Sequence, residues 1–321
     1  MGTDKPGGLS KFFAAIFTEK KNLKFFLISF FGFVVVFGAI TTGIILLSNA
    51  TKKVETASSS APASSTTSYT PSATDAFNVM ILGFNDFSGP VKSIQLMRVD
   101  PAKGQLPIIS FPTFTFSQTD NKIRYLSECY TEGGKALLQR ALEDITGAKI
   151  DYYVAIDLNG FSSILSGLGN ITFTLPSDIN YVDNKDPQNP IHYDVKKGKY
   201  TLDADKAVVV MRYTQYVGGD VERGNIHAQF IKALITQKLN KNLLNDAENQ
   251  YSKYAGFVQT NFSIPALVTH MNAIKYTIAL GGEQIQYLEL PGGTKKINSK
   301  SYYEINYTQV ADMFTAYFGG K

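Results

Sequence analysis

An uninterrupted apolar run over residues 25–47 constrains this chain more than any other part of its sequence. Its 23 residues include no charged side chain. As a helix the run would be about 34 Å long, at about 1.5 Å per residue, which is enough to cross the hydrocarbon core of a bilayer. It stays apolar to its end, where a secretory signal peptide would have a small-residue cleavage site. The sequence therefore favours a retained transmembrane helix over a cleaved signal.

The charges on either side of this run predict its orientation. The lysines before it are Lys5, Lys11, Lys20, Lys21 and Lys24, and those just after it are Lys52 and Lys53. Because positive charge is enriched on the cytoplasmic side, residues 1–24 are predicted to be cytoplasmic. Residues 48–75 are rich in Ser, Thr, Ala and Pro, a composition typical of a flexible stalk. Residues 76–321 are then an extracytoplasmic domain held at the cell membrane.

The overall composition indicates a packed domain and excludes several classes of protein. Hydrophobic residues make up 44% of the chain and charged residues 18%, which is typical of a globular protein. The net charge of +4, from 31 Lys and Arg against 27 Asp and Glu, argues against a nucleic-acid partner. Cys129 is the single cysteine, so an intramolecular disulfide and a cysteine-based zinc cluster are excluded. We expect Cys129 to be a buried free thiol.

From residue 77 onward, short apolar segments typical of strands alternate with segments of helical periodicity. The predicted strands cover residues 78–82, 93–99, 106–111, 152–156 and 284–290. The predicted helices cover residues 134–142, 159–169, 226–239 and 308–317, with a further helix that begins at residues 203–206. This alternation predicts one α/β domain, an α/β/α sandwich with a mixed central sheet.

Common catalytic motifs are missing from the sequence. There is no P-loop, HExxH, GxSxG or CxxC pattern, which argues against the usual nucleotide-binding, metallohydrolase and serine-hydrolase classes. The three histidines, His192, His227 and His270, are too scattered to predict a metal cluster.

The five arginines are the more informative charged residues. They are Arg98, Arg124, Arg140, Arg212 and Arg223. Arg212 and Arg223 flank residues 213–222, whose VGGD core is turn-like and precedes a predicted helix. A guanidinium group binds phosphate bidentately, and a helix N-terminus favours anions. The segment is therefore interpreted either as a phosphate site or as a loop held by structural salt bridges.

The order of segments resembles the LytR-CpsA-Psr family of Gram-positive bacteria. The matching residues are 81–83, 93–101, 110–112, 122–123, 133–134, 150–154, 158–161, 167–173, 211–212 and 219–223. The resemblance implies an extracytoplasmic α/β domain with an apolar pocket for a polyprenyl chain. It also implies transfer of a glycopolymer, such as teichoic acid or capsular polysaccharide, from a polyprenyl (pyro)phosphate carrier to peptidoglycan, aided by Mg²⁺.

Position by position, the resemblance keeps some site residues and replaces others. The retained residues are Lys122, Arg212, Asp220 and Arg223. Of the positions where the family has acidic residues, one holds Asn85, with Asp86 next to it, and another holds Lys92. Where the family has further arginines and glutamines, this chain has Thr113, Thr214, Ile226, His227 and Ala228.

The resemblance thus implies Arg212 and Arg223 as catalytic residues. Phosphate binding would fall to Lys92, Lys122, Arg212 and Arg223, and Asp220, Asn85, Asp86 and His227 would support them. An amide and an ammonium in place of two carboxylates do not make a magnesium site, because Mg²⁺ prefers anionic oxygen ligands.

Two hypotheses about function remain open on the sequence alone. In the first, Lys92 takes the place of the lost cation, and the domain binds a polyprenyl-linked glycopolymer and transfers it slowly to peptidoglycan without metal. In the second, the domain is a non-catalytic envelope protein that holds polyprenyl-linked phosphates or partner proteins. A eukaryotic adhesion ectodomain ranks last, because its four sequons, at Asn49, Asn170, Asn261 and Asn306, are not accompanied by disulfides.

Overall fold

The computed structural model describes residues 69–184, 191–238, 257–262 and 264–320. The predicted cytoplasmic segment 1–24, the predicted transmembrane helix over 25–47 and most of the predicted stalk lie outside these ranges. Within them, no helix combines the length and the apolar character needed to cross a membrane.

A six-stranded mixed sheet forms the centre of the described domain, in the order β11-β6-β1-β2-β3-β12. Its strands are β1 (Phe77–Phe84), β2 (Val91–Val99), β3 (Leu106–Phe111), β6 (Tyr152–Asp157), β11 (Val258–Thr260) and β12 (Ile285–Leu288). Strand β1 runs antiparallel to β2 and parallel to β6. Strand β12 is parallel to β3, whereas β11 is antiparallel to β6. The predicted mixed α/β sheet and its five predicted strands are therefore confirmed.

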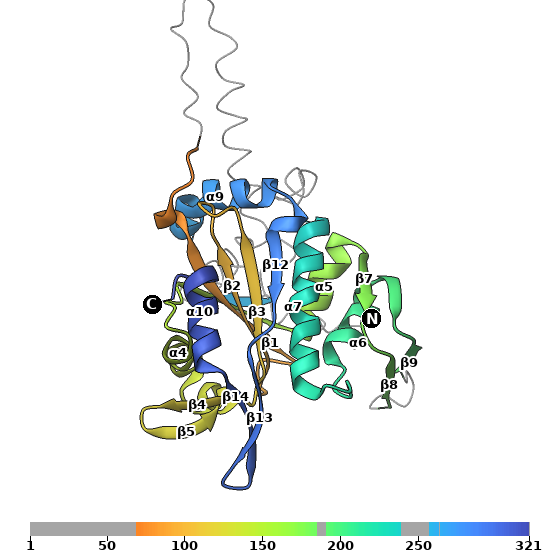
Figure 1. Ribbon diagram of the computed structural model, residues 1–321. Helices are drawn as coiled ribbons and strands as arrows, with labels where there is room; N and C mark the ends of the chain where they lie inside the picture. The colour runs from red at the N-terminus through yellow and green to blue at the C-terminus, as the bar shows by residue number, and fades with distance from the viewer. Residues whose placement is uncertain (1–68, 185–190, 239–256, 263, 321) are drawn as a thin grey trace, which may run out of the picture.

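Helices cover both faces of this sheet (Figure 1). They are α4 (Leu126–Thr146), α5 (Leu158–Leu168), α7 (Gly219–Lys238), α9 (Ile264–Ala279) and α10 (Tyr307–Tyr317), while α6 (Ala204–Arg212) packs against α5. Successive residues of β1 point to opposite faces, as the strand period of two requires. Met80 and Leu82 pack with α4 and α10, while Val79 and Ile81 pack in a second core with α5, α7 and α9.

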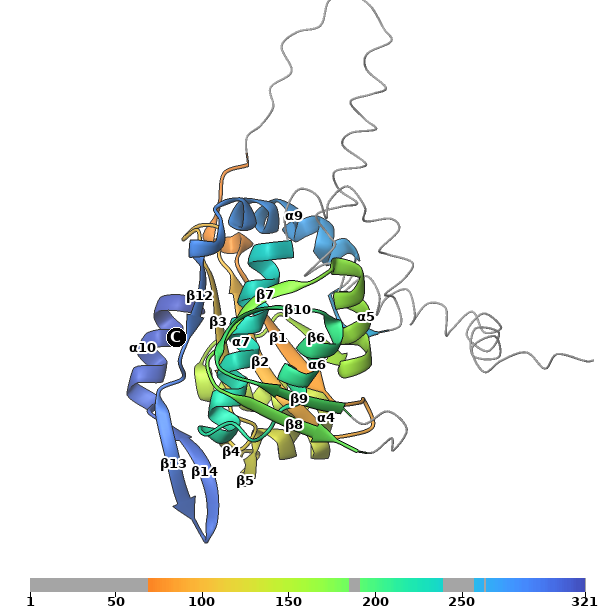
Figure 2. The ribbon, with the colours of Figure 1, turned by 90° about the vertical axis from the view of Figure 1, so that its right-hand side faces the viewer.

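A smaller layer lies beside α5, α6 and α7 (Figure 2). It contains the antiparallel pair of β7 (Ile171–Leu175) and β10 (Gly198–Leu202) and the hairpin of β8 (Ile179–Asp183) and β9 (Ile191–Val195). Phe173 and Phe230 are centred 5.1 Å apart in the core that joins this layer to α7. Two more hairpins, β4 (Phe116–Thr119) with β5 (Lys122–Tyr125) and β13 (Gly292–Ile297) with β14 (Lys300–Ile305), complete the described elements together with the short η1 (Ala73–Asp75) and η3 (Gly282–Gln284).

Two predicted helices begin earlier than their periodicity indicated. Helix α4 starts at Leu126, and a kink at Gly133 and Gly134 separates its first turns from the part that the pattern detected. Gly134 has a φ of 61°, in the left-handed region that interrupts a helical pattern. Helix α7 starts at Gly219, so Asp220 and Arg223 lie in its first turns and not in a loop before it. The helix predicted at residues 203–206 is α6, capped by the Asp203 carboxylate.

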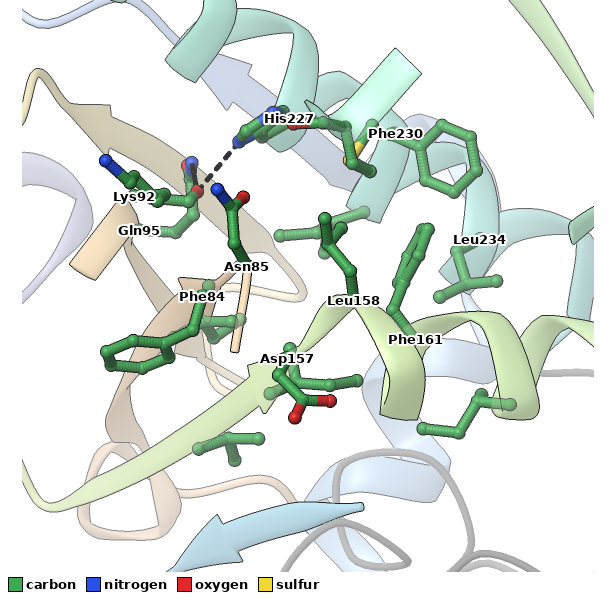
Figure 3. A pocket seen from close by; sticks show the side chains of 18 of the residues that line it. Phe84, Asn85, Lys92, Gln95, Asp157, Leu158, Phe161, His227, Phe230 and Leu234 are labelled. Atoms are coloured by element: carbon green, nitrogen blue, oxygen red, sulfur yellow. Dashed lines mark hydrogen bonds between the residues drawn. The ribbon is translucent and has the colours of Figure 1, made fainter. Parts of the chain in front are cut away.

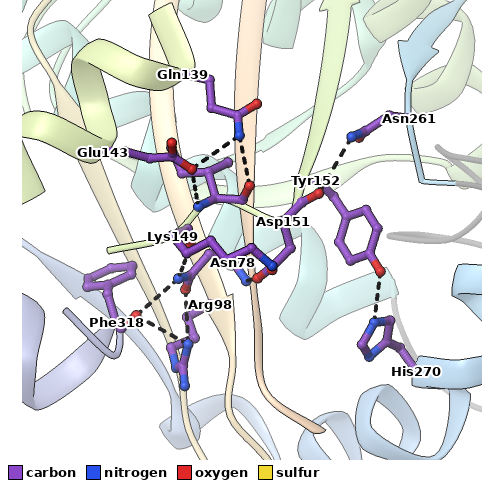
Figure 4. A network of polar contacts seen from close by, with 11 residues as sticks. Asn78, Arg98, Gln139, Glu143, Lys149, Asp151, Tyr152, Asn261, His270 and Phe318 are labelled. Carbon is purple, nitrogen blue, oxygen red and sulfur yellow. Dashed lines mark hydrogen bonds and ion pairs between the residues drawn. The ribbon is translucent and has the colours of Figure 1, made fainter. Parts of the chain in front are cut away.

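Strands β1 and β6 begin at the same end of the sheet. A network of hydrogen bonds links this end to the surrounding helices (Figure 4). The Asn78 side chain donates to the carbonyls of Lys149 (2.7 Å) and Phe318 (3.0 Å). Arg98 donates to the same Phe318 carbonyl (3.2 Å) and pairs with Asp100 (3.1 Å). These buried groups are satisfied by one another, so this network is structural. Cys129 is a buried free thiol, as predicted.

Candidate active site: an apolar pocket with a polar mouth

A pocket of about 110 Å³, open to solvent, lies between the sheet, α5 and α7. Its walls are mostly apolar. The apolar lining residues include Ile81, Val154, Ile156, Leu158, Phe161, Ile164, Leu165, Phe230, Ile231 and Leu234. They come together because β1, β6, α5 and α7 all turn an apolar side toward this layer. Such a cavity suits a branched hydrocarbon chain.

Lys92, Asn85, Gln95 and His227 lie together at one end of the pocket, Asp157 lies apart from them, and the end at Phe161, Phe230 and Leu234 is apolar (Figure 3). The polar lining residues are Asn85, Lys92, Ser93, Gln95, Asp157 and His227. Of the described residues that line the pocket, Lys92 alone carries a fixed positive charge. Asp157 is already engaged, because its carboxylate caps α5 by accepting from the Gly160 amide (2.7 Å). The polar end therefore offers an anion the Lys92 ammonium group and the Asn85 amide.

His227 is buried in the pocket wall, with 6% of its surface exposed. Its Nε2 lies 3.1 Å from the Met211 carbonyl oxygen, and its Nδ1 lies 2.9 Å from Ser93 Oγ. A carbonyl only accepts, so Nε2 carries the proton and the neutral ring accepts from the Ser93 hydroxyl through Nδ1. Burial, with the nearby charge of Arg223, lowers the pKa of His227 to about 3. His227 is therefore neutral at physiological pH.

Gln95 lies beneath this pair and is 1% exposed. Its Nε2 donates to Ser93 Oγ (3.0 Å), to the Gly224 carbonyl (3.3 Å) and to Ser110 Oγ (3.3 Å). The contact with a carbonyl fixes the orientation of the amide. Among the described residues, none donates a hydrogen bond to the buried Gln95 Oε1.

Arg223 and Asp220 form an ion pair within the first turns of α7. Arg223 also donates to the Lys92 carbonyl (3.1 Å), so its guanidinium lies beside the backbone of β2 at Lys92. Asp220 accepts from the amide and the hydroxyl of Thr113, at 2.6 and 2.8 Å. Of the four predicted phosphate-binding residues, Arg223 thus contacts Lys92, but through the Lys92 backbone, and only Lys92 is among the residues that line the pocket.

Arg212 and Lys122 lie elsewhere. Arg212 pairs with Asp183 of β8 (3.3 Å) and lines a second pocket with residues of α5, α6 and β9. Its neighbour Met211 faces the first pocket, so the two residues point to different sides of α6. Lys122 is exposed in the β4–β5 hairpin, beside α4. Neither residue is among those that line the pocket with Lys92.

The two remaining predicted residues differ in their surroundings. Asn85 lines the pocket mouth beside Lys92 (Figure 3). Asp86 is turned to its own loop, where its carboxylate accepts from the amide and hydroxyl of Ser88. These hydrogen bonds hold the pKa of Asp86 below its usual range.

The side chains at the mouth are poor ligands for Mg²⁺. An amide, an ammonium group and a carboxylate that already caps a helix offer fewer anionic oxygens than this ion prefers. Within the described ranges, no three or more His, Cys, Asp or Glu residues are grouped so that they could hold a metal ion.

Ser93, Gln95 and Asp157 were not among the residues predicted for the site. Ser93 follows Lys92 in the chain, but a lone serine in a strand carries no recognisable signal. Gln95 was the better clue, because a polar residue at a buried position of an apolar strand requires partners.

Comparison with known proteins identifies relatives of this domain. The model of the LytR_cpsA_psr family matches residues 41–318. The polyisoprenyl-teichoic acid–peptidoglycan teichoic acid transferase TagU of Bacillus licheniformis is 23% identical over 245 residues, which cover 74% of this chain and 76% of TagU. The transferase of the same description named TagV, from Bacillus subtilis, is 25% identical over 199 residues, or 59% of this chain and 50% of TagV.

Solved structures share the fold. The crystal structure of B. subtilis TagV matches with a TM-score of 0.63 and 21% identity, covering 77% of this chain and 98% of that one. A structure of TagT bound to LI-WTA matches with a TM-score of 0.60 and 17% identity, covering 76% and 91% of the two chains.

Proposed function

The chain belongs to the LytR_cpsA_psr family, and on that basis we propose that its folded domain binds a polyprenyl-phosphate-linked glycopolymer and transfers the glycopolymer to peptidoglycan. The relatives TagU and TagV bear names that describe this reaction with teichoic acid as the glycopolymer. In this proposal the domain works outside the cell and is held at the membrane by the helix predicted over residues 25–47.

The observation that carries the proposal is the apolar pocket with Lys92 at its polar mouth. The prenyl chain would lie among the side chains of α5 and α7, where burial contributes about 0.8 kcal/mol for each CH₂ group removed from water. The (pyro)phosphate would then lie at the mouth, beside the Lys92 ammonium and the Asn85 amide. One ligand with an apolar tail and an anionic head matches both ends of the cavity.

Arg223 supports this site from the first turns of α7. Its guanidinium lies against the Lys92 carbonyl and is partly neutralised by Asp220. In our proposal Arg223 raises the local positive potential at the phosphate while Lys92 makes the direct contact. Arg212 keeps its structural ion pair with Asp183 and contributes less than Arg223 to phosphate binding.

The first prediction concerns Lys92. Lys92→Ala is expected to weaken binding of a polyprenyl phosphate by about 10- to 100-fold, because a hydrogen bond to a charged group contributes about 1.5–3 kcal/mol. The measurement is the dissociation constant of undecaprenyl phosphate for the full-length protein in detergent. Lys122→Ala is the matched control, since it removes the same charge from the exposed β4–β5 hairpin and is expected to leave the constant unchanged. Equal losses in the two variants would refute a phosphate site at Lys92.

The second prediction concerns metal. Because Lys92 already supplies positive charge at the mouth and the donors there do not suit Mg²⁺, lipid binding and transfer are expected to be insensitive to EDTA. The measurement compares both quantities in EDTA and in added Mg²⁺, using Lys92→Asp as the reference variant. That variant restores a carboxylate, so its binding is expected to become dependent on Mg²⁺. A loss of activity in EDTA for the unchanged protein would contradict metal-free binding.

A second candidate function is that of a non-catalytic holder of polyprenyl-linked phosphates. The ion pairs of Arg212 and Arg223 favour it, because guanidinium groups engaged by Asp183 and Asp220 are less available to a transition state.

One experiment separates the two functions. The full-length protein is incubated with a radiolabelled polyprenyl-linked glycopolymer and purified peptidoglycan, and label is counted on the washed peptidoglycan. Transfer that is faster than in a protein-free control supports the transferase. Retained lipid without transfer supports the holder, and absence of both refutes the lipid site altogether.

A further inference from the structure

A serine and a histidine that the proposed phosphate site does not use lie in the same pocket wall. The half-buried Ser93 hydroxyl donates to Nδ1 of the neutral His227 ring at 2.9 Å. Ser93 comes from β2 and His227 from α7, and both line the cavity. A hydroxyl that donates to an imidazole is the arrangement in which a nucleophile is activated by an adjacent general base.

A third group orients the base. The Met211 carbonyl accepts from His227 Nε2 at 3.1 Å, which fixes the tautomer in which Nδ1 is free to take a proton. The ring cannot turn without breaking this hydrogen bond. Nucleophile, base and orienting group are thus all present, in the order Ser93, His227 and Met211.

The surroundings of Ser93 also suit an attacking oxygen. Gln95 donates to Ser93 Oγ at 3.0 Å and would stabilise negative charge as it develops there. Across the β1–β2 ladder the partner of Ser93 is Gly83, where a Cβ atom would come within 2.9 Å of the Ser93 Cβ. Glycine at this position keeps the side of Ser93 that faces the pocket uncovered. Lys92, the proposed phosphate contact, is the preceding residue.

Resting on the proposed function, we propose that Ser93 is the nucleophile of the transfer reaction and that His227 is its general base, so that the glycopolymer passes through a phosphoserine-linked intermediate. The substrate class is a polyprenyl pyrophosphate-linked glycopolymer.

The proposed reaction has two steps. In the first, Ser93 Oγ bonds to the phosphorus that carries the glycopolymer, and the bond from that phosphorus to the bridging oxygen breaks. Polyprenyl phosphate leaves with the electron pair, and the hydroxyl proton moves to His227 Nδ1. In the second, a peptidoglycan hydroxyl attacks the same phosphorus and gives up its proton. By then the His227 ring has lost the first proton to water, so in this step it takes the proton of the attacking hydroxyl, and as the bond to Ser93 Oγ breaks it passes that proton to the serine oxygen.

A weakly basic imidazole is sufficient for this chemistry. Phosphoryl transfer passes through a loose transition state in which positioning and charge stabilisation dominate, and even a carboxylate accepts the hydroxyl proton in protein kinases. The buried His227 is unprotonated at every physiological pH and is therefore always in the form that accepts a proton.

The test uses full-length protein in detergent with a pyrophosphate-linked glycopolymer and no acceptor. The expected result is a burst of about one equivalent of polyprenyl phosphate, as covalent catalysis requires. Mass spectrometry is expected to find glycopolymer phosphate on the peptide that contains Ser93. Ser93→Ala is expected to lose the burst and the adduct while its binding of undecaprenyl phosphate changes by less than threefold. His227→Gln is expected to slow the burst by about 10²- to 10⁴-fold with KM unchanged.

Ser110→Ala is the matched control, because Ser110 also contacts Gln95 but does not line this pocket. It is expected to form the adduct at the normal rate, and thermal unfolding establishes that each variant is folded. Transfer to peptidoglycan without a burst, or with Ser93→Ala at the normal rate, would overturn the nucleophile and leave the proposed function standing. Lipid binding with no transfer by the unchanged protein would overturn both.

Discussion

Ile231→Trp is expected to weaken binding of undecaprenyl phosphate by at least about 100-fold, because the indole would fill the space that the prenyl chain needs. Ile231 lies on α7 and lines the apolar part of the pocket. Excluding about five carbons at about 0.8 kcal/mol each costs about 4 kcal/mol, and each 1.4 kcal/mol is a factor of ten in affinity. The measurement is the dissociation constant of the lipid for full-length protein in detergent.

Leu280→Trp is the control for this substitution. Leu280 is 42% exposed and does not line the pocket, so the same residue placed there is expected to leave lipid binding unchanged. Thermal unfolding of Ile231→Trp checks that the domain is intact. Normal lipid affinity in a folded Ile231→Trp variant would show that the prenyl chain binds elsewhere. The Ile231 and Lys92 variants together probe the two ends of one ligand.

The second large effect is a loss of stability in mild acid caused by His227. Its folded-state pKa of about 3 lies below the ordinary value of 6.5, so below pH 6.5 the unfolded chain takes up a proton that the folded domain does not. The free energy of unfolding is therefore expected to be independent of this group above pH 6.5. As the pH falls from 6.5 toward 3, it is expected to decrease by up to about 1.4 kcal/mol per pH unit.

His227→Gln isolates this contribution. Burial also lowers the pKa of His270, and the carboxylates with lowered pKa values, such as Asp86 and Asp203, lose their stabilising effect only below about pH 4. Chemical denaturation of the unchanged protein and of the variant between pH 4.5 and 7.5 therefore measures the His227 contribution as the difference of two slopes. Identical slopes in the two proteins would mean that His227 is protonated in the folded state.

Ser93→Ala and His227→Gln have separate readouts in these experiments. Removing the hydroxyl leaves the His227 Nδ1 without its donor, a cost of about 1–3 kcal/mol, whereas glutamine retains hydrogen-bonding groups but accepts no proton in this role. Measuring stability, lipid affinity and adduct formation for each variant therefore distinguishes a folding defect from a loss of the transfer chemistry.

Much of the fold follows from local patterns in the chain. The strands over 78–82, 93–99 and 106–111 and the start of α6 at Asp203 were predictable, because alternation and capping depend on neighbouring residues. The early starts of α4 and α7 were not, since glycines at 133, 134 and 219 interrupt the periodicity although the backbone continues as helix around them. Packing against the sheet stabilises these turns despite the poor helix propensity of glycine.

The site, like the fold, has features that the sequence predicted and features that only the structure revealed. From residue types and short spacings, the sequence by itself predicted a long apolar run before an α/β domain, with Arg212 and Arg223 as candidate phosphate ligands. The family resemblance added Lys92, Lys122 and His227 to the predicted site. Only the tertiary structure decided that Lys92 lies at the mouth of an apolar cavity while Arg212 turns to Asp183 and Lys122 lies on a separate hairpin.

The same holds for the Ser93–His227 contact, which joins residues 134 positions apart in the chain. Its partners meet because α7 packs across β2 and β3, with Gly224 allowing the helix to come close to Ser110. Contacts of this kind depend on which faces of distant elements are buried together, and no local spacing in the chain encodes them.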